Sequence, residues 1–239
     1  RWTDITTPSQ LRLHGADGNE IRTIEANPVT TLAEYRLSKP EFLQVKTRDG
    51  GSMDALMIKP PDFDARRRYP VYQFTYSGPG SSQVLNSWKG QDSMFYQLLA
   101  QSGVVVWVLD NRSASQRGVE AQWPVYGRLG EYELQDLEDG ITWLKQQPYI
   151  DASRIVLSGW SFGGFMTAYA LTHSTSWSAG VVGAPVSDLR DYDSVFTERY
   201  MKQLKNNPDG YRRTAPRFAA DRLHGKMLLI HGTMDDNVH

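Results

Sequence analysis

The stretch GWSFG, residues 159–163, places Ser161 between two glycines. It follows the β-forming residues 153–159 and opens the helix-forming residues 162–173. By itself the pentapeptide is a weak signal, because glycine-rich turns contain it by chance. At a strand-to-helix junction it is typical of a nucleophile elbow, a sharp turn that exposes the serine hydroxyl. The sequence therefore predicts that Ser161 is a nucleophile.

A serine nucleophile also needs donors for the oxyanion that its attack creates, and an acid that orients a general base. The helix that begins at Phe162 directs its first amides toward a developing negative charge, so the Phe162 N–H is a candidate donor. Asp235 and Asp236 follow the apolar residues 225–232, a predicted strand. In one class of hydrolase the serine comes first in the chain and the acid follows a later strand, which is the order found here. The alternative for Asp235 and Asp236 is an acidic surface turn.

The general base should be a histidine that follows the acid. The sequence has five histidines, and none suits this role. His14 lies in a predicted hairpin turn, His173 at the far end of the helix after Ser161, and His224 and His231 flank the last predicted strand. His239 is only four residues past Asp235 and is the least improbable exception. We therefore expect the catalytic histidine to lie outside this sequence.

Length and composition narrow the remaining classes. The chain has 239 residues and a net charge of −1, which fits one large α/β domain and does not suggest a partner nucleic acid or membrane surface. It has no cysteine, which excludes disulfides and thiolate metal sites, and we expect no metal or other cofactor. No apolar run is long enough to span a bilayer. The sequence leaves the compartment open, and the bacterial periplasm and the cytoplasm are the two alternatives for a soluble protein. The chain begins with Arg1, and we interpret it as a piece of something longer.

Strands alternate with helices along most of the chain, and this order predicts a mostly parallel, doubly wound sheet. Residues 104–110 form a continuous apolar run, as expected for a strand buried on both faces. Residues 131–147 place Leu134, Leu137, Ile141 and Leu144 on one helix face. The other predicted elements are strands at 41–47, 53–60, 70–76, 153–159, 178–184 and 225–232, and helices at 92–102 and 162–173.

Two short alternating runs precede this region and meet at Asp17-Gly18, a dipeptide that favours a hairpin turn. An isolated hairpin is marginal in water, so this one is interpreted as the remnant of a larger sheet. Residues 27–40 form a connector to the α/β region.

Three longer motifs, GWSFGG, GAPVSDLRDYDSVFTERYM and LLIHGTMDDNVH, closely resemble the prolyl oligopeptidase family of serine peptidases, within it the dipeptidyl peptidase IV group. The resemblance implies an α/β-hydrolase domain at residues 39–239, truncated at its C-terminus. It also implies that residues 1–38 are the hairpin end of a β-propeller and a connector.

Carried over residue by residue, the resemblance implies a site. Ser161 is the nucleophile and Asp235 the acid, while Tyr76 in YSGPG supplies a phenol that joins the Phe162 amide in the oxyanion hole. The residues that would bind substrate are Tyr192 for its amino terminus, Asn237 for a carbonyl, and Val186, Leu189, Phe196 and Val238 for a proline pocket. Plain core packing is the alternative for these four apolar residues.

Phe162 and Phe196 stand where dipeptidyl peptidase IV has tyrosines, and Leu189 where it has tryptophan. The first change keeps the backbone donor, and the other two allow a wider or more apolar pocket.

The resemblance implies that the chain comes from a homodimeric serine dipeptidyl peptidase. That enzyme would release Xaa-Pro or Xaa-Ala dipeptides from peptides with a free N-terminus. The glutamates that bind this terminus would lie in the propeller, and the histidine beyond Asp235, so residues 1–239 alone are predicted to be almost inactive. The alternatives are a tripeptidyl peptidase, oligopeptidase or esterase on the same scaffold, or a non-catalytic interaction protein.

Overall fold

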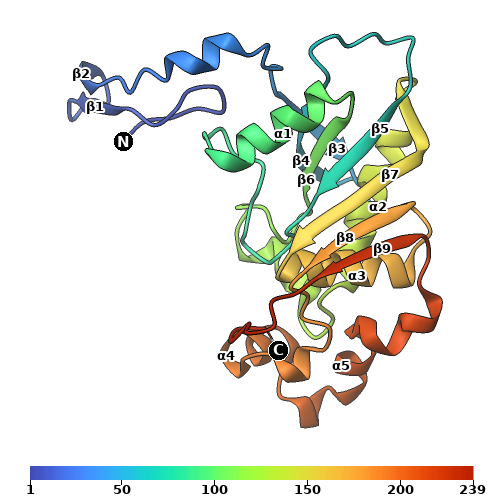
Figure 1. Cartoon of the computed structure of the whole chain (residues 1–239). Coiled ribbons are helices and arrows are strands. Elements are labelled where there is room, and N and C mark those ends of the chain that lie inside the picture. The colour runs from blue at the N-terminus through green and yellow to red at the C-terminus, as the bar shows by residue number, and fades with distance from the viewer. Residues whose placement is uncertain (239) are drawn as a thin grey trace.

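A single seven-stranded sheet forms the centre of the protein, as the computed structural model of residues 1–238 shows (Figure 1). The strands lie in the order β3-β4-β6-β5-β7-β8-β9. They are β3 (Glu41–Lys46), β4 (Ser52–Ile58), β5 (Tyr69–Phe74), β6 (Val105–Asp110), β7 (Ile150–Trp160), β8 (Ala179–Gly183) and β9 (Lys226–Ile230).

The five strands from β6 to β9 run parallel, whereas β3 and β4 pair antiparallel at one edge. Every residue of β6 is buried, as its continuous apolar run predicts. This arrangement confirms the predicted mostly parallel α/β sheet. The strand β7 is longer than predicted, because it begins at Ile150 rather than at Ser153.

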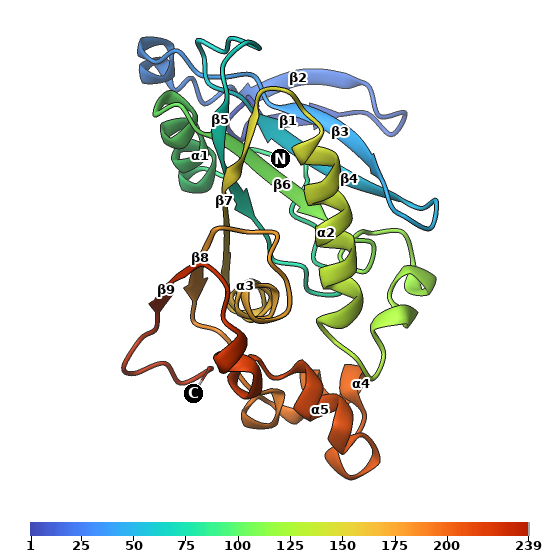
Figure 2. The ribbon, with the colours of Figure 1, turned by 90° about the vertical axis from the view of Figure 1, so that its right-hand side faces the viewer.

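Helices cover both faces of the sheet (Figure 2). The helix α1 (Gln91–Gln101) covers one face, and α2 (Glu131–Lys145) and α3 (Phe162–His173) cover the other. The predicted apolar stripe of α2 is buried in the main core, together with nearly all of α3. Since α3 begins directly after β7, the core holds the residues after Ser161 rigidly.

Two short helices, α4 (Ser194–Met201) and α5 (Pro208–Thr214), lie below α3 in both views (Figures 1 and 2). The sequence predicted no element between residues 184 and 225. Short 3₁₀ turns complete the chain: η1 (Thr30–Glu34), η2 (Val119–Ala121), η3 (Trp123–Val125), η4 (Leu189–Asp191), η5 (Leu204–Asn206) and η6 (Pro216–Arg222).

The N-terminal hairpin, β1 (Leu11–His14) with β2 (Glu20–Glu25), stands away from the sheet (Figure 1). All six residues of β2 are exposed. The segment before the hairpin touches the loop ahead of α1, where the Ile5 N–H donates to Asn86 at 3.0 Å. The hairpin therefore contributes little to the main core.

The last strand, β9, leaves apolar side chains in water at the other edge of the sheet. Its four apolar residues have exposed fractions of 41 to 57%. Parallel strands are ordinarily covered on both faces, so β9 is unusual within the described chain. No helix among the described residues is long and apolar enough to cross a membrane.

Candidate active site

The register of the parallel strands brings the predicted catalytic segments to one edge of the sheet. Phe74 of β5 pairs with Ser158 of β7, Trp160 of β7 with Gly183 of β8, and Gly183 with Ile230 of β9. The residues directly after β5, β7 and β9 therefore emerge side by side. These residues open the segments that carry Tyr76, Ser161 and Asp235.

Ser161 occupies a sharp turn between β7 and α3. Its φ of 58° lies in the left-handed region, where a residue with a side chain is strained. The Ser161 N–H donates to the Gly183 carbonyl at 3.0 Å, and its own carbonyl accepts from the Phe165 N–H at 2.9 Å. These backbone bonds hold the strained turn on which the hydroxyl is presented, as the elbow pattern predicts.

Two of the glycines around Ser161 are required by close backbone contacts. A Cβ on Gly163 would overlap the Thr75 carbonyl oxygen, and one on Gly159 would lie 2.6 Å from the same oxygen. Both glycines thus allow β5, β7 and the first turn of α3 to approach each other. The spacing of the pentapeptide is therefore a packing requirement of the elbow.

The helix α3 begins directly after Ser161, so its first amides lie next to the nucleophile in the chain. As the first helical residue, Phe162 has an N–H without an acceptor inside the helix. The Tyr76 ring lies next to the Phe162 ring, with centroids 6.3 Å apart, and it covers Gly78. The structure thus brings Tyr76 and Phe162, the residues of the two predicted oxyanion donors, into neighbouring positions.

The loop after β9 is organised around the carboxylate of Asp235. Its Oδ1 accepts the N–H groups of Asn237 and Val238 at 3.1 and 2.9 Å. The His231 Nε2 lies 2.8 Å from the Val238 carbonyl oxygen and 3.5 Å from Asp235 Oδ2. Because a carbonyl only accepts, this nitrogen carries a proton and donates it within the loop.

The acid and the nucleophile lie two strands apart along the same edge. Neighbouring strands are about 4.8 Å apart, so the loop after β9 begins roughly 10 Å from the end of β7. The geometry is therefore compatible with a base held between Ser161 and Asp235.

Each described histidine is held elsewhere, and the His224 N–H donates to the Leu171 carbonyl near the end of α3 at 2.8 Å. His173 stacks on Tyr169 at the far end of α3, where burial lowers the pKa of its imidazole. His14 belongs to the distant hairpin, and His231 is held by its own loop. His239 lies outside the described residues.

The predicted substrate residues divide into buried and accessible ones. Val186, Leu189 and Val238 are almost fully buried in the main core, whereas Asn237 is exposed. Tyr192 and Phe196 are partly buried, and their ring centroids lie 5.8 Å apart. The ring centroids of Phe196 and Phe162 lie 5.9 Å apart. The aromatic pair thus extends from the residue after the nucleophile.

The turn that carries Leu189 is held by the buried Asp188 carboxylate and two partly exposed arginines. The Asp188 side chain is fully buried and accepts from the Arg190 guanidinium, with Nη2 to Oδ2 at 2.6 Å, and from Arg217 at 3.1 Å. Burial alone would raise the pKa of Asp188, but the hydrogen bonds from Arg190 hold it below its usual value. The sequence reasoning missed this pair.

A second missed group holds the segment that follows Tyr76 and Ser77. The buried Asp110 carboxylate, at the end of β6, accepts the N–H groups of Gln83 and Val84 at 2.8 and 3.0 Å. Burial raises the pKa of Asp110, although these two N–H groups oppose the rise. The polar run DNRSAS directly after the most buried strand was a signal that could have located this support. The described residues include no cluster of acidic and histidine side chains that could hold a metal.

A mostly parallel sheet with a serine on a strand-to-helix elbow is the arrangement of the α/β hydrolases. The chain belongs to the prolyl oligopeptidase family, whose sequence pattern matches residues 91–239. It is similar to the dipeptidyl peptidase 4 of Trichophyton equinum, with 38% identity over 92% of this chain and 29% of that protein. The dipeptidyl peptidase 4 of Arthroderma otae is 37% identical over the same shares.

Among solved structures, the chain is similar to the dipeptidyl peptidase 4 of Porphyromonas gingivalis. The TM-score is 0.94 with 38% identity, over all of this chain and 34% of the other. The chain thus spans about a third of the length of these relatives. The family membership confirms the resemblance noted in the sequence.

Proposed function

We propose that this chain carries the nucleophile, acid and oxyanion donors of a serine dipeptidyl peptidase. The observation that carries the proposal is the strained Ser161 turn, beside which the Phe162 N–H and the Tyr76 ring lie together. The names of the relatives support the dipeptidyl activity.

In the proposed reaction, the Ser161 Oγ attacks the carbonyl carbon of the second substrate residue. Its proton passes to a histidine oriented by Asp235, and the Phe162 N–H and Tyr76 hydroxyl donate to the oxyanion. The histidine then protonates the departing amine, which leaves a dipeptidyl ester on Ser161. Water, deprotonated by the same histidine, hydrolyses this ester and restores the serine.

We further propose that this chain is part of a longer polypeptide, in which residues 1–38 end a β-propeller and residues 39–239 begin the peptidase domain. The exposed apolar residues of β9 support this, since a parallel strand ordinarily has cover on both faces. The histidine and the acidic groups that bind the substrate amino terminus would lie outside the described residues. A homodimer is part of the same proposal.

The proposed substrate has a free N-terminus and proline or alanine as its second residue. Tyr192 and Phe196 form an aromatic wall next to Phe162, and a flat pyrrolidine ring has no N–H to satisfy there. Val186, Leu189 and Val238 would support this wall from the core, and Asn237 would donate to a substrate carbonyl.

The test uses the longer polypeptide and three substrates: Gly-Pro anilide, its N-acetylated form and Ala-Ala-Pro anilide. We expect turnover of the first alone. Equal turnover of the acetylated substrate would instead indicate an oligopeptidase, and preference for Ala-Ala-Pro a tripeptidyl peptidase. Cleavage of a short acyl ester alone would indicate an esterase.

Matched variants test the residue roles. Ser161→Ala should abolish turnover, and Asp235→Asn should lower kcat about 10⁴-fold, because the base loses its orienting partner. Asp236→Asn, the neighbouring acid, should leave kcat within about twofold of the wild type. Equal losses in the two aspartate variants would refute the assignment of Asp235.

The polypeptide of residues 1–239 provides a further test. Without the general base, only the small residual catalysis of the oxyanion hole remains. A fluorophosphonate should therefore label Ser161 slowly in this polypeptide and rapidly in the longer one. Rapid stoichiometric labelling of residues 1–239 would contradict the proposed position of the histidine.

A further inference from the structure

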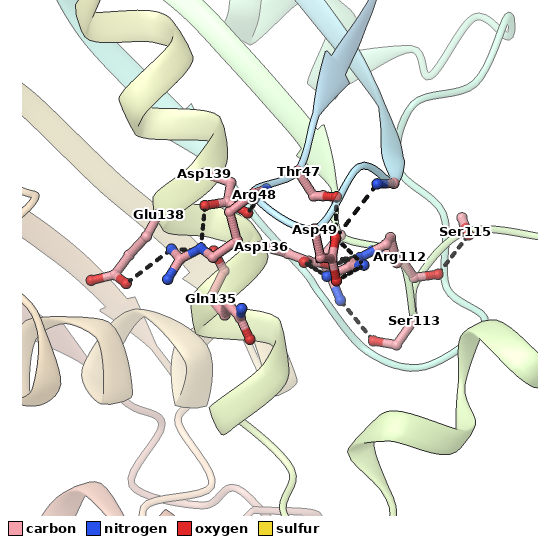
Figure 3. A network of polar contacts seen from close by, with 12 residues as sticks. Thr47, Arg48, Asp49, Arg112, Ser113, Ser115, Gln135, Asp136, Glu138 and Asp139 are labelled. Carbon is pink, nitrogen blue, oxygen red and sulfur yellow. Dashed lines mark hydrogen bonds and ion pairs between the residues drawn. The ribbon is translucent and has the colours of Figure 1, made fainter.

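A buried ion pair joins α2 to the loop after β6 (Figure 3). The Asp136 side chain has no exposed surface, and that of Arg112 is 14% exposed. The Arg112 Nη2 lies 2.7 Å from Asp136 Oδ1, and the backbone N–H of Arg112 donates to Asp136 Oδ2 at 2.8 Å. One carboxylate therefore holds the backbone of Arg112 as well as its guanidinium.

The loop around Arg112 is closed on itself by short hydrogen bonds. The Ser115 hydroxyl donates to the Arg112 carbonyl at 2.6 Å, and the Ala114 N–H donates to the Asn111 carbonyl at 3.0 Å. The Asn111 amide nitrogen donates to the Ser113 hydroxyl at 2.7 Å. Residues 111–115 thus form a compact unit, which we call the anchor loop.

The segment after β5, residues 77–84, rests on the anchor loop. The Gly80 N–H donates to the Ser113 carbonyl at 2.8 Å, and the Ser82 hydroxyl donates to the Ala114 carbonyl at 3.0 Å. Movement of the anchor loop would therefore move residues 77–84.

Tyr76 directly precedes this segment and packs on it. No hydrogen bond within residues 1–238 fixes its phenol oxygen, and its ring lies over Gly78 of the same segment. The next residue, Ser77, has a left-handed φ of 62°, so the chain turns sharply after Tyr76. The phenol position is consequently set by backbone that the anchor loop supports.

We infer that Arg112 and Asp136 are positioning residues for the oxyanion donor Tyr76, acting through the anchor loop. The inference rests on the proposed function, because the position of the Tyr76 hydroxyl affects the rate only if this hydroxyl donates to the oxyanion. A buried ion pair contributes little net stability compared with an apolar pair, so its value lies in the geometry that it fixes. A displacement of even 1 Å at a catalytic donor is costly for the rate.

A second ion pair on the same helix offers a matched control (Figure 3). The Asp139 carboxylate holds Arg48 in the same manner, through the backbone N–H at 2.9 Å and Nε at 2.7 Å. Arg48 belongs to the turn between β3 and β4, and the carboxylate of the next residue, Asp49, accepts from Arg112 Nη1 at 2.7 Å. Asp49 is also held by the Thr47 hydroxyl at 2.5 Å, so loss of the Arg48–Asp139 pair disturbs α2 but keeps the bonds of Arg112 to Asp136 in place.

The experiment measures steady-state kinetics of the longer polypeptide in a double-mutant cycle. We expect Asp136→Asn to lower kcat roughly tenfold or more with KM within about twofold, since the donor acts in the transition state. In a Tyr76→Phe background the same substitution should cause no further loss, because the phenol is already absent. Asp139→Asn should leave kcat within about twofold.

Hydrogen exchange supplies a readout that does not depend on activity. In Asp136→Asn the amides of Gly80, Gln83 and Val84 should exchange faster, and in Asp139→Asn they should not. Should Asp136→Asn fail to fold, Arg112→Lys is measured in its place, because it keeps the charge and loses the bidentate contact.

Three outcomes would overturn the inference: additive losses in the cycle, an equal kcat loss in Asp139→Asn, or unchanged exchange at residues 80–84. A failure of the proposed function has a different signature. In that case Tyr76→Phe leaves kcat unchanged while the exchange still responds to Asp136→Asn. That result would remove the catalytic role of the phenol and keep the anchoring of the loop.

Discussion

The residues around Ser161 must both form the sharp turn of the nucleophile and fit into a tightly packed core. The left-handed serine is strained, and the glycines beside it have no room for a Cβ. Such strain persists only where the surrounding core imposes it, and here α3 is buried along nearly its whole length. The reactive geometry therefore depends on the packing of β5, β7 and α3.

Tyr76→Phe should lower kcat for the dipeptide anilide by about 10²- to 10³-fold with little change in KM. The phenol donates to an oxyanion that exists only after attack, so its loss affects the transition state alone. Steady-state kinetics of the longer polypeptide provide the measurement. The matched control is Tyr72→Phe in β5, the strand that precedes Tyr76; the Tyr72 ring packs against Phe95 of α1. A similar loss in both variants would show that the effect is not specific to Tyr76.

Gly163→Ala should destabilise the domain by about 1–3 kcal/mol, because the added methyl group overlaps the Thr75 carbonyl and nothing flexible can yield. Denaturant unfolding measures the change. Gly232→Ala is the control, since its Cβ would have no neighbour closer than 3.8 Å. If both variants unfold at the same denaturant concentration, the close approach at Gly163 is not a constraint.

At the scale of elements, the short helix α4 shows how a local cap serves a distant site. The Asp193 carboxylate accepts the Phe196 N–H at 2.7 Å and so begins the helix. At its other end, the Tyr200 carbonyl accepts the Gly127 N–H at 2.6 Å. A helix of eight residues has little stability of its own, so these contacts place Phe196 against Phe162.

Asp193→Ala should cost about 1 kcal/mol of stability, the usual effect of removing a helix N-cap. If the whole of this free energy is lost from substrate binding at the aromatic wall, KM for the prolyl substrate rises by up to about fivefold. Asp193→Asn keeps an oxygen acceptor and should behave as the wild type. Identical KM values for the alanine and asparagine variants would contradict the role of the cap.

At the scale of the whole molecule, separate parts of the chain meet around the start of α2. The fully buried Glu133 accepts the Gly130 N–H at 2.8 Å through Oε2, and the neighbouring Leu129 N–H donates to the Met201 sulfur of α4. The other Glu133 oxygen has no hydrogen-bond partner within the described chain. Burial raises the pKa of Glu133 to about 8.

This raised pKa makes folding stability fall with rising pH. Above the ordinary value near 4.5 the unfolded carboxyl loses its proton, whereas the folded one keeps it until about pH 8. The free energy of unfolding of Glu133→Gln, relative to the wild type, should therefore increase between about pH 4.5 and 8 and level off above. Unfolding at a series of pH values measures this slope. Parallel pH profiles for the two proteins would show that Glu133 does not titrate in this range.

Much of the sheet could be predicted from the sequence, because each strand and long helix carries its own periodicity. The apolar run of β6 and the stripe of α2 specify their buried faces without reference to other elements. The helices α4 and α5 were missed, since segments of eight and seven residues have too few turns to show a period. Their stability comes from contacts with residues far away in the chain.

The sequence by itself determined the nucleophile motif, its place between a strand and a helix, and the chain order of serine and acid. Only the tertiary structure decided which distant side chains meet, such as Tyr76 with Phe162 and Arg112 with Asp136. The physical reason is that local periodicity records which face of an element is buried, but not which element covers it. The order of the strands, with β6 between β4 and β5, sets those meetings through long-range pairing that no short stretch of sequence encodes.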